Sequence, residues 1–365
     1  MAIDGLIIPR AYNDYINKTD AATLSQALQL PSVMDLTPTE NSNRPVRSGG
    51  IYAALAGKQP TLTLDGNPTK GSNNPVSSDG LYTALGAIFI HNVPRLTPKD
   101  ITAYVTDGSL WDRIAGINGF ALFEDIYIGD YIRMSRAISA YERTGQYQTA
   151  GSQYVTIAGL DTMMNNGDQG SGVDYHHAVM VAGQGFGGTQ HFGRSRMNAT
   201  NTTEGGYKAS EMNTLVLGDV VSAGSTAADA TINQQLYAEF GAHLKTTREL
   251  VSNAINATGY NRFGSATGCA SNWEWISAQA ILMSETECYG SIAWSSSGYD
   301  TGNANRQLPL FAFSKQAQNN RSAYYWLKDI ASAANFCIAY AIGASYYRNA
   351  SLAHHYVRPR FILGA

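Results

Sequence analysis

Charged residues are scarce in this sequence. Asp, Glu, Lys and Arg make up 15% of its 365 residues, against about 25% in a typical soluble protein. The net charge of −3 argues against nucleic acid as the main partner, because phosphate contacts need a basic surface. Long apolar runs are missing too: 84–90 and 336–342 fall far short of the roughly 18 residues of a spanning helix. We therefore expect no membrane insertion.

Cysteine is also rare. The three cysteines, Cys269, Cys288 and Cys337, are too few for a disulfide framework and have no CxxC spacing. The first residues lack the basic stretch of a secretory signal, so we expect synthesis in a cytoplasm. Small and neutral polar residues replace the missing charge: the chain has 36 Gly and 22 Tyr, against 11 Phe and 5 Trp. Such a composition is typical of recognition surfaces.

An internal repeat occupies the first third of the chain. Residues 42–55 align with residues 72–85 at an offset of 30, and nine of the 14 positions are identical. Each copy predicts an extended entry through Pro, a Ser N-cap and a short helix. Two copies are too few for a self-supporting solenoid, so we expect three chains to share each layer in a homotrimer. The alternative is a loosely folded linker with a chance similarity.

Four regions follow from these patterns. Residues 1–35 form a lead-in, with a short helix predicted over 20–28, and residues 36–87 contain the two repeats. Residues 88–120 are predicted to be a neck, with one short helix that begins at a Thr97 cap and ends before Gly108.

The remaining region, 121–365, has short apolar runs between loops rich in Gly, Asn and Ser. This texture is typical of an α+β domain. The predicted strands are 123–128, 154–160 and 178–182, and the predicted helices are 211–221 and 231–256, the second broken near Gly241.

Three ordered segments mark the C-terminal third: 282–290 (LMSETECYG), 325–328 (YWLK) and 357–361 (VRPRF). Their order resembles the C-type-lectin-like domain, related to the formylglycine-generating-enzyme fold, that ends some bacteriophage tail proteins. The repeats likewise resemble those of phage tail fibres. Lys328 departs from the family, which has Arg at this position, and a Lys point charge does not replace a bidentate guanidinium.

The resemblance implies a receptor-binding protein at the tip of a phage tail. Residues 1–35 would attach to the tail or baseplate, the repeats and neck would form a trimeric stalk, and 121–365 would bind a bacterial surface protein or glycan. The mature protein would be part of the virion. It would act by contact, with no catalysis, cofactor or metal. The alternatives are a polysaccharide-degrading tail spike and a bacterial surface adhesin encoded by a prophage.

The last 37 residues contain no Lys, Gln, Glu, Met or Trp. In some phage tips of this kind a retroelement randomises template adenines, and an AAC codon becomes NNC, a codon set that excludes the same five residues. The other interpretation is a chance absence in a small, Ala-rich segment. The variable surface expected here comprises Asn335, Tyr340, Ile342, Ser345, Tyr347, Arg348, Leu352, His354 and His355.

Other chemistry is weakly indicated. The pairs His176-His177 and His354-His355 are adjacent, so their rings would point to opposite faces of a strand and would not share one metal ion. Glu285 and Glu287 could form a carboxylate pair. The family resemblance instead implies that they cap a helix or pair with Arg358 or Arg360.

Overall fold

The computed structural model describes residues 35–42, 46, 48–56, 64–66, 71–78, 80–81, 92–141, 149–168, 170–260, 266–295, 307–318 and 324–365, with 253–260 and 266–272 described by their backbone alone. The chain divides into two compact units, Met1–Leu81 and Tyr82–Ala365. The lead-in helix predicted over 20–28 lies outside the described residues.

In the first unit the described residues of the two sequence repeats share a β-bridge. Helix α3 (Ser48–Ala56) follows a parallel bridge between Asp35 and Val46, and the second copy has the same bridge, between Asp65 and Val76. Both bridge partners are shifted by the 30 residues that separate the copies in the sequence. The described residues of the two copies therefore share this bridge at the same offset as the sequence repeat, and the predicted short helix after the Pro-Val segment is confirmed in the first copy.

A glycine at the same position of each copy lies very close to the backbone of a preceding segment. A Cβ atom at Gly50 would lie 1.9 Å from the carbonyl oxygen of Leu36, and one at Gly80 would lie 1.8 Å from that of Gly66. Both distances are far inside van der Waals contact. The turn and the helix that follows it can approach this closely only where no side chain intervenes.

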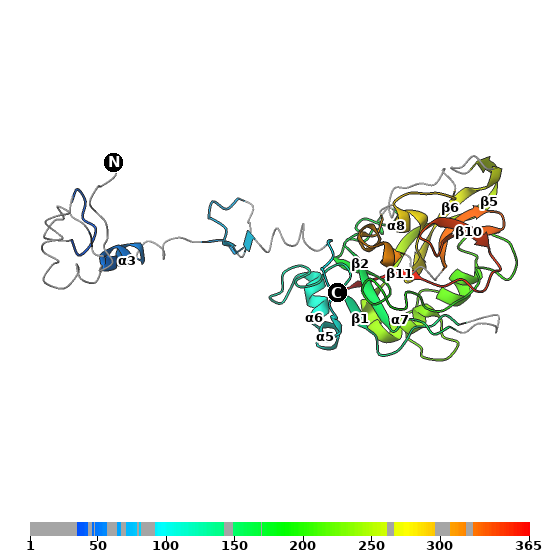
Figure 1. Cartoon of the computed structure of the whole chain (residues 1–365), viewed down its shortest axis with the longest axis horizontal. Helices are drawn as coiled ribbons and strands as arrows, with labels where there is room; N and C mark the ends of the chain where they lie inside the picture. The colour runs from blue at the N-terminus through cyan, green and yellow to red at the C-terminus, as the bar shows by residue number, and fades with distance from the viewer. Residues whose placement is uncertain are drawn as a thin grey trace, which may run out of the picture. The chain divides into compact units, whose positions relative to one another are not determined.

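The second unit is an α+β domain, as the sequence predicts (Figure 1). Antiparallel pairing links all its named strands, in a six-stranded sheet of order β1-β2-β3-β11-β4 with β7 also on β11, a three-stranded sheet β10-β9-β8, and the hairpin β5-β6. The strands are β1 (Tyr131–Arg133), β2 (Tyr154–Leu160), β3 (His177–Ala182), β4 (Leu244–Lys245), β5 (Thr247–Tyr260), β6 (Ala266–Ala278), β7 (Ile281–Leu282), β8 (Tyr325–Ser332), β9 (Asn335–Ala339), β10 (Ser345–Asn349) and β11 (Pro359–Gly364).

Short helices surround these sheets. None in the described part of the chain is long and apolar enough to cross a membrane. They are α5 (Thr102–Thr106), α6 (Ser109–Ala115), the π-helix η2 (Met212–Leu217), α7 (Ile232–Phe240), the 3₁₀ turn η3 (Gly241–His243), α8 (Glu285–Tyr289), α9 (Pro309–Phe313) and α10 (Lys315–Gln318).

The centre of the large sheet is fully buried. Every residue of β3 and β11 is buried, and so are all but the first residue of β2. The predicted strands at 154–160 and 178–182 are confirmed, because short apolar runs of this length fit strands that are covered on both faces.

The region expected to be a neck belongs to this domain in the structure. Ile101, Leu110 and Ile114 are buried in the same core as the large sheet. Lys99 and Asp130 join the segment before α5 to the start of β1, since the Lys99 amide donates to the Asp130 carboxylate at 2.9 Å. Helix α5 begins at Thr102, later than the Thr97 cap predicted.

Two other predictions fail in part or in full. The helix predicted over 231–256 with a break near Gly241 is confirmed up to that break, since α7 ends at Phe240 and Gly241 has a φ of +57°, but the part after the break is wrong because the chain enters β4 and β5. Residues 247–260 form a strand because β6 supplies their cross-strand partners, and the local spacing of residues does not reveal those partners. The strand predicted at 123–128 is a turn, because Phe123 and Asp125 both have positive φ.

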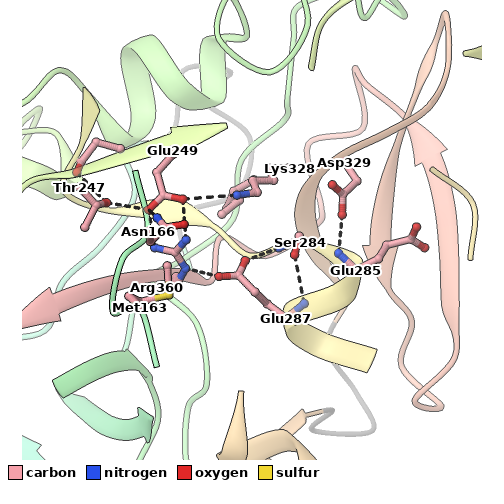
Figure 2. A network of polar contacts seen from close by, with 12 residues as sticks. Met163, Asn166, Thr247, Glu249, Ser284, Glu285, Glu287, Lys328, Asp329 and Arg360 are labelled. Carbon is pink, nitrogen blue, oxygen red and sulfur yellow. Dashed lines mark hydrogen bonds and ion pairs between the residues drawn. The ribbon is translucent and has the colours of Figure 1, made fainter. Parts of the chain in front are cut away.

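A buried ionic network ties β5, β8, β11 and helix α8 together (Figure 2). Arg360 binds both carboxylate oxygens of Glu249, at 3.0 and 2.7 Å, and its Nε donates to Glu287. The Lys328 ammonium lies 3.6 Å from Glu249. The four side chains are at most 4% exposed, and their two positive and two negative charges cancel.

The expectation that Glu285 and Glu287 serve the fold is confirmed. Ser284 and Glu287 form a capping box on α8: the Ser284 side chain accepts from the Glu287 amide, and the Glu287 side chain accepts from the Ser284 amide. Arg360 is the arginine that pairs with Glu287. Arg358 instead has its guanidinium against the rings of Phe311 and Tyr325.

Candidate functional site

The C-terminal segment of unusual composition folds as a hairpin and a loop. Strands β9 and β10 pair in register from Asn335↔Asn349 to Ala339↔Ser345, and they are the central and edge strands of the three-stranded sheet (Figure 1, orange). The turn between them closes with hydrogen bonds from the Gly343 amide to the Tyr340 carbonyl and from the Tyr340 amide to the Ala344 carbonyl, both 2.8 Å. Gly343 has a φ of +88°, which favours glycine.

Backbone hydrogen bonds hold the loop that follows β10. The Ala350 carbonyl accepts from two amides of the 197–198 segment, at 2.9 and 3.0 Å. Farther along, the Tyr356 amide donates to the Tyr324 carbonyl at 2.7 Å, and the Val357 amide donates to the Gly193 carbonyl at 2.9 Å. The loop is therefore fixed at both ends by main-chain contacts with distant parts of the domain.

The predicted surface residues differ widely in exposure. Ile342 is 79% exposed and His354 is exposed, whereas His355 is only 1% exposed. The others are partly buried: Asn335, Tyr340, Ser345, Tyr347, Arg348 and Leu352.

Aromatic rings connect many of these residues. Tyr346 lies 5.0 Å from Tyr347 in a parallel stack and 5.8 Å from Tyr340, measured between ring centroids. The chain of rings continues from Tyr347 to Trp294 at 4.9 Å and from Tyr340 to Tyr324 at 4.8 Å. Such offset and edge contacts are each worth roughly 0.5–1.5 kcal/mol beyond area burial. The rings therefore support one another from three separate segments of the chain.

Arg348 lies on this set of rings. Its guanidinium carbon is 4.5 Å from the centre of the Tyr346 ring and 5.6 Å from that of Tyr340. One of its nitrogens, Nη1, donates to the Tyr347 carbonyl at 3.1 Å. We call Trp294, Tyr324, Tyr340, Ile342, Tyr346, Tyr347, Arg348 and His354 the aromatic surface.

His355 lies beneath this surface. Its ring is 4.6 Å from Trp326 and 4.6 Å from His354. Burial, together with the charges of His354, Arg348 and Arg194, lowers the pKa of His355 to about 3. Neither ring nitrogen has a hydrogen-bond partner in the described part of the chain. The ring is therefore neutral at pH 7 and packs as an aromatic group.

A buried carboxylate connects this surface to helix α8. Glu285 accepts hydrogen bonds from the amides of 293–295, from the Ser295 hydroxyl at 2.9 Å and from the Ser345 hydroxyl of β10. Its own amide donates to Asp329 (Figure 2). Burial and the Glu285 charge raise the pKa of Asp329 to about 7. Ser345, predicted as a contact residue, is thus also a structural one.

Two predicted residues lie apart from the rings. Asn335 begins β9, at the far end of the hairpin from the turn, and bonds to the Ser332 hydroxyl at 2.8 Å. Leu352 packs against the core, as do Trp294, Tyr324, Tyr340 and Tyr347 of the aromatic surface. The aromatic surface also contains three residues that the sequence interpretation missed. Tyr346 was detectable by its place in the same segment, but Trp294 and Tyr324 come from other segments and no local pattern marks them.

The other chemical candidates are structural. His177 is buried and accepts from the Met163 amide at 3.1 Å, while its neighbour His176 pairs with Asp161 at 2.6 Å. Burial raises the pKa values of the Cys288 and Cys337 thiols, which disfavours the reactive thiolate. Within the described ranges no group of three or more His, Cys, Asp or Glu could hold a metal ion.

The aromatic surface is thus the arrangement best suited to a ligand: it combines partly exposed rings, one guanidinium and a backbone fixed by the fold. These features serve non-covalent contact. Comparisons with protein-family models, with curated proteins and with solved structures found nothing that matches this chain.

Proposed function

We propose that this protein is a receptor-binding protein of a bacteriophage tail, with a C-type-lectin-like domain that contacts a ligand on the bacterial surface. The observation that carries the proposal is the aromatic surface, which the segment of unusual composition forms together with Trp294 and Tyr324. Tyr and Arg are the residues that most often dominate binding energy at interfaces. The site would be part of the virion, at the tip of the tail.

The first unit supports the stalk in this proposal. Helix α3 leaves Ile51, Tyr52 and Leu55 exposed by 45%, 76% and 61%, and these apolar side chains are candidates for contact with further copies of the chain. A homotrimer would present three aromatic surfaces, so weak individual contacts would gain strength by avidity. Sedimentation of the full-length protein should give three times the chain mass of 39.3 kDa. A monomer would contradict the trimer and leave the binding function open.

Binding of labelled full-length protein to intact bacteria tests the function. We expect Ile342→Ser to reduce cell binding at least tenfold with a melting temperature within about 2 °C of the parent, because the side chain is 79% exposed. Ile117→Ser is the matched control, since Ile117 is 50% exposed on the loop after α6. Equal binding by the two variants, or no bacterial strain bound by the parent protein, would contradict the proposal.

A further inference from the structure

We infer that the ligand of the aromatic surface is an acidic glycan, with Arg348 binding its carboxylate or phosphate and the tyrosine rings packing against its sugar rings. This inference rests on the proposed function and names the chemical class of the receptor. It is argued from the charge of the surface, from the setting of Arg348 and from the size of the patch.

The surface has a positive charge and no exposed negative one among its residues. The chain contains no Asp or Glu after residue 329, and Arg348 is the charged member of the aromatic surface. Arg194 has its guanidinium 4.5 Å from the centre of the Tyr356 ring. The charges of Arg348 and Arg194 both lower the pKa of His355, so both lie near that ring. Glu285, whose carboxylate bonds to the Ser345 hydroxyl of β10, is fully buried and accepts five hydrogen bonds from three amides and two hydroxyls. Charge complementarity therefore favours an anionic ligand.

Arg348 is held in a fixed orientation before any ligand arrives. The Tyr346 ring supports one face of the guanidinium at 4.5 Å, and the Tyr347 carbonyl takes one donor at 3.1 Å. A guanidinium has five N–H donors in a planar fork that matches a carboxylate or a phosphate. Because the side chain is already ordered, less rotamer entropy is lost on binding.

The size of the patch favours a glycan over a folded protein. A typical protein–protein interface uses roughly 20–30 residues on each side, whereas the aromatic surface has the eight members defined above, of which Ile342, Tyr346 and His354 are exposed. A sugar ring has an apolar C–H face that can lie on a tyrosine ring, and hydroxyl groups that can bond to the tyrosine hydroxyls and to Arg348. A patch of this size accommodates a few sugar units.

The experiment uses the full-length protein and a bacterial strain that it binds. Cells are treated with periodate, which cleaves sugar diols, or with protease. The polysaccharide extract of the same strain is immobilised untreated, after reduction of its carboxyl groups, or after mild removal of its phosphates. We expect periodate to abolish cell binding and protease to leave it intact. One of the two chemical treatments of the extract should remove binding, and which one does so identifies the anionic group.

Variants at Arg348 give the residue-level test. We expect Arg348→Gln to weaken binding to the extract at least tenfold, and Arg348→Lys to weaken it less but to increase its sensitivity to salt, since the charge remains and the fork is lost. Arg133→Gln is the matched control, because it removes one exposed positive charge from β1. Equal binding by Arg348→Gln and Arg133→Gln would overturn the inference.

The outcomes separate the inference from the proposed function. Cell binding that is lost after protease and kept after periodate would mean a protein receptor, which overturns the inference and leaves receptor binding intact. An extract that binds equally well after both chemical treatments would mean a neutral glycan, which also overturns it. Failure to bind any bacterial cell would contradict the proposed function itself.

Discussion

The buried network around Arg360 allows a quantitative prediction. Glu249 is fully buried, binds Arg360 through both oxygens and accepts from the Thr247 hydroxyl at 2.6 Å (Figure 2). The variant Glu249→Gln keeps the shape of the side chain and removes its charge. Of the four side chains, Arg360 then keeps Glu287 as its partner and Lys328 loses the carboxylate that it lies against, which leaves this cluster with a surplus positive charge.

The expected cost is large. Removing one partner of a buried ion pair costs roughly 3–5 kcal/mol. The pKa of Glu249 gives a second estimate: despite burial, Arg360 and Lys328 lower it from 4.5 to about 2, which corresponds to about 3 kcal/mol. For a domain of this size a loss of about 3 kcal/mol lowers the melting temperature by roughly 5 °C. Because the folded-state pKa is depressed, this stabilisation is present above about pH 4.5 and is lost as the pH falls toward 2.

Urea denaturation of the parent protein and the variant at pH 7 and pH 3 measures both effects. The difference in unfolding free energy should be about 3 kcal/mol at pH 7 and should shrink at pH 3. Glu211→Gln is the control, because Glu211 pairs with Arg196 in a half-exposed ion pair that is worth at most about 1 kcal/mol. The double variant Glu249→Gln/Lys328→Met restores neutrality and should be more stable than Glu249→Gln. A loss below 1 kcal/mol, or an unchanged pH dependence, would refute the reasoning.

Two further predictions concern the repeat and the buried histidine. Gly50→Ala places a Cβ 1.9 Å from the Leu36 carbonyl oxygen and should speed amide hydrogen exchange throughout α3. In Gly49→Ala the added Cβ meets nothing within 4 Å, so this variant should slow exchange by favouring the helix. Equal exchange rates in the two variants would contradict the close approach of Gly50 to Leu36. His355 has its pKa lowered from 6.5 to about 3, so the parent protein should lose stability as the pH falls through this window, by up to about 1.4 kcal/mol per pH unit. His355→Phe retains a ring beside Trp326 and should flatten the dependence of stability on pH. If calorimetry shows the same pH dependence in the variant as in the parent, the pKa of His355 is not lowered in the folded protein.

The sequence predicts the parts of this fold that local signals specify. The buried strand 154–160 and the short helix in the first copy of the repeat depend on neighbours in the chain. The residue spacing before Asn256 predicts a helix where β5 lies, because only the pairing of β5 with β6 excludes one. The helices of 92–120 were assigned to a neck because a sequence does not reveal that Ile101 and Ile114 meet the central sheet.

The candidate site was predictable to a similar extent. Composition drew attention to the segment that contains Tyr340, Tyr347 and Arg348, and these three residues do lie together. The same composition gave no means of separating exposed Ile342 from buried His355. That distinction depends on the packing of the loop against Trp326, a contact between segments far apart in the chain.

The main-chain anchoring of the segment from Tyr340 to Val357 has a consequence for its evolution. The turn at Gly343, the carbonyl of Ala350 and the amide of Val357 are all held by backbone hydrogen bonds, which remain available when a displayed side chain is replaced by any residue other than proline. Positions such as Ile342 can therefore change without changing the course of the chain. Ser345 is different, because its hydroxyl bonds to buried Glu285. Substitutions should accordingly be tolerated unevenly along this segment, with the freedom greatest where the backbone alone maintains the shape.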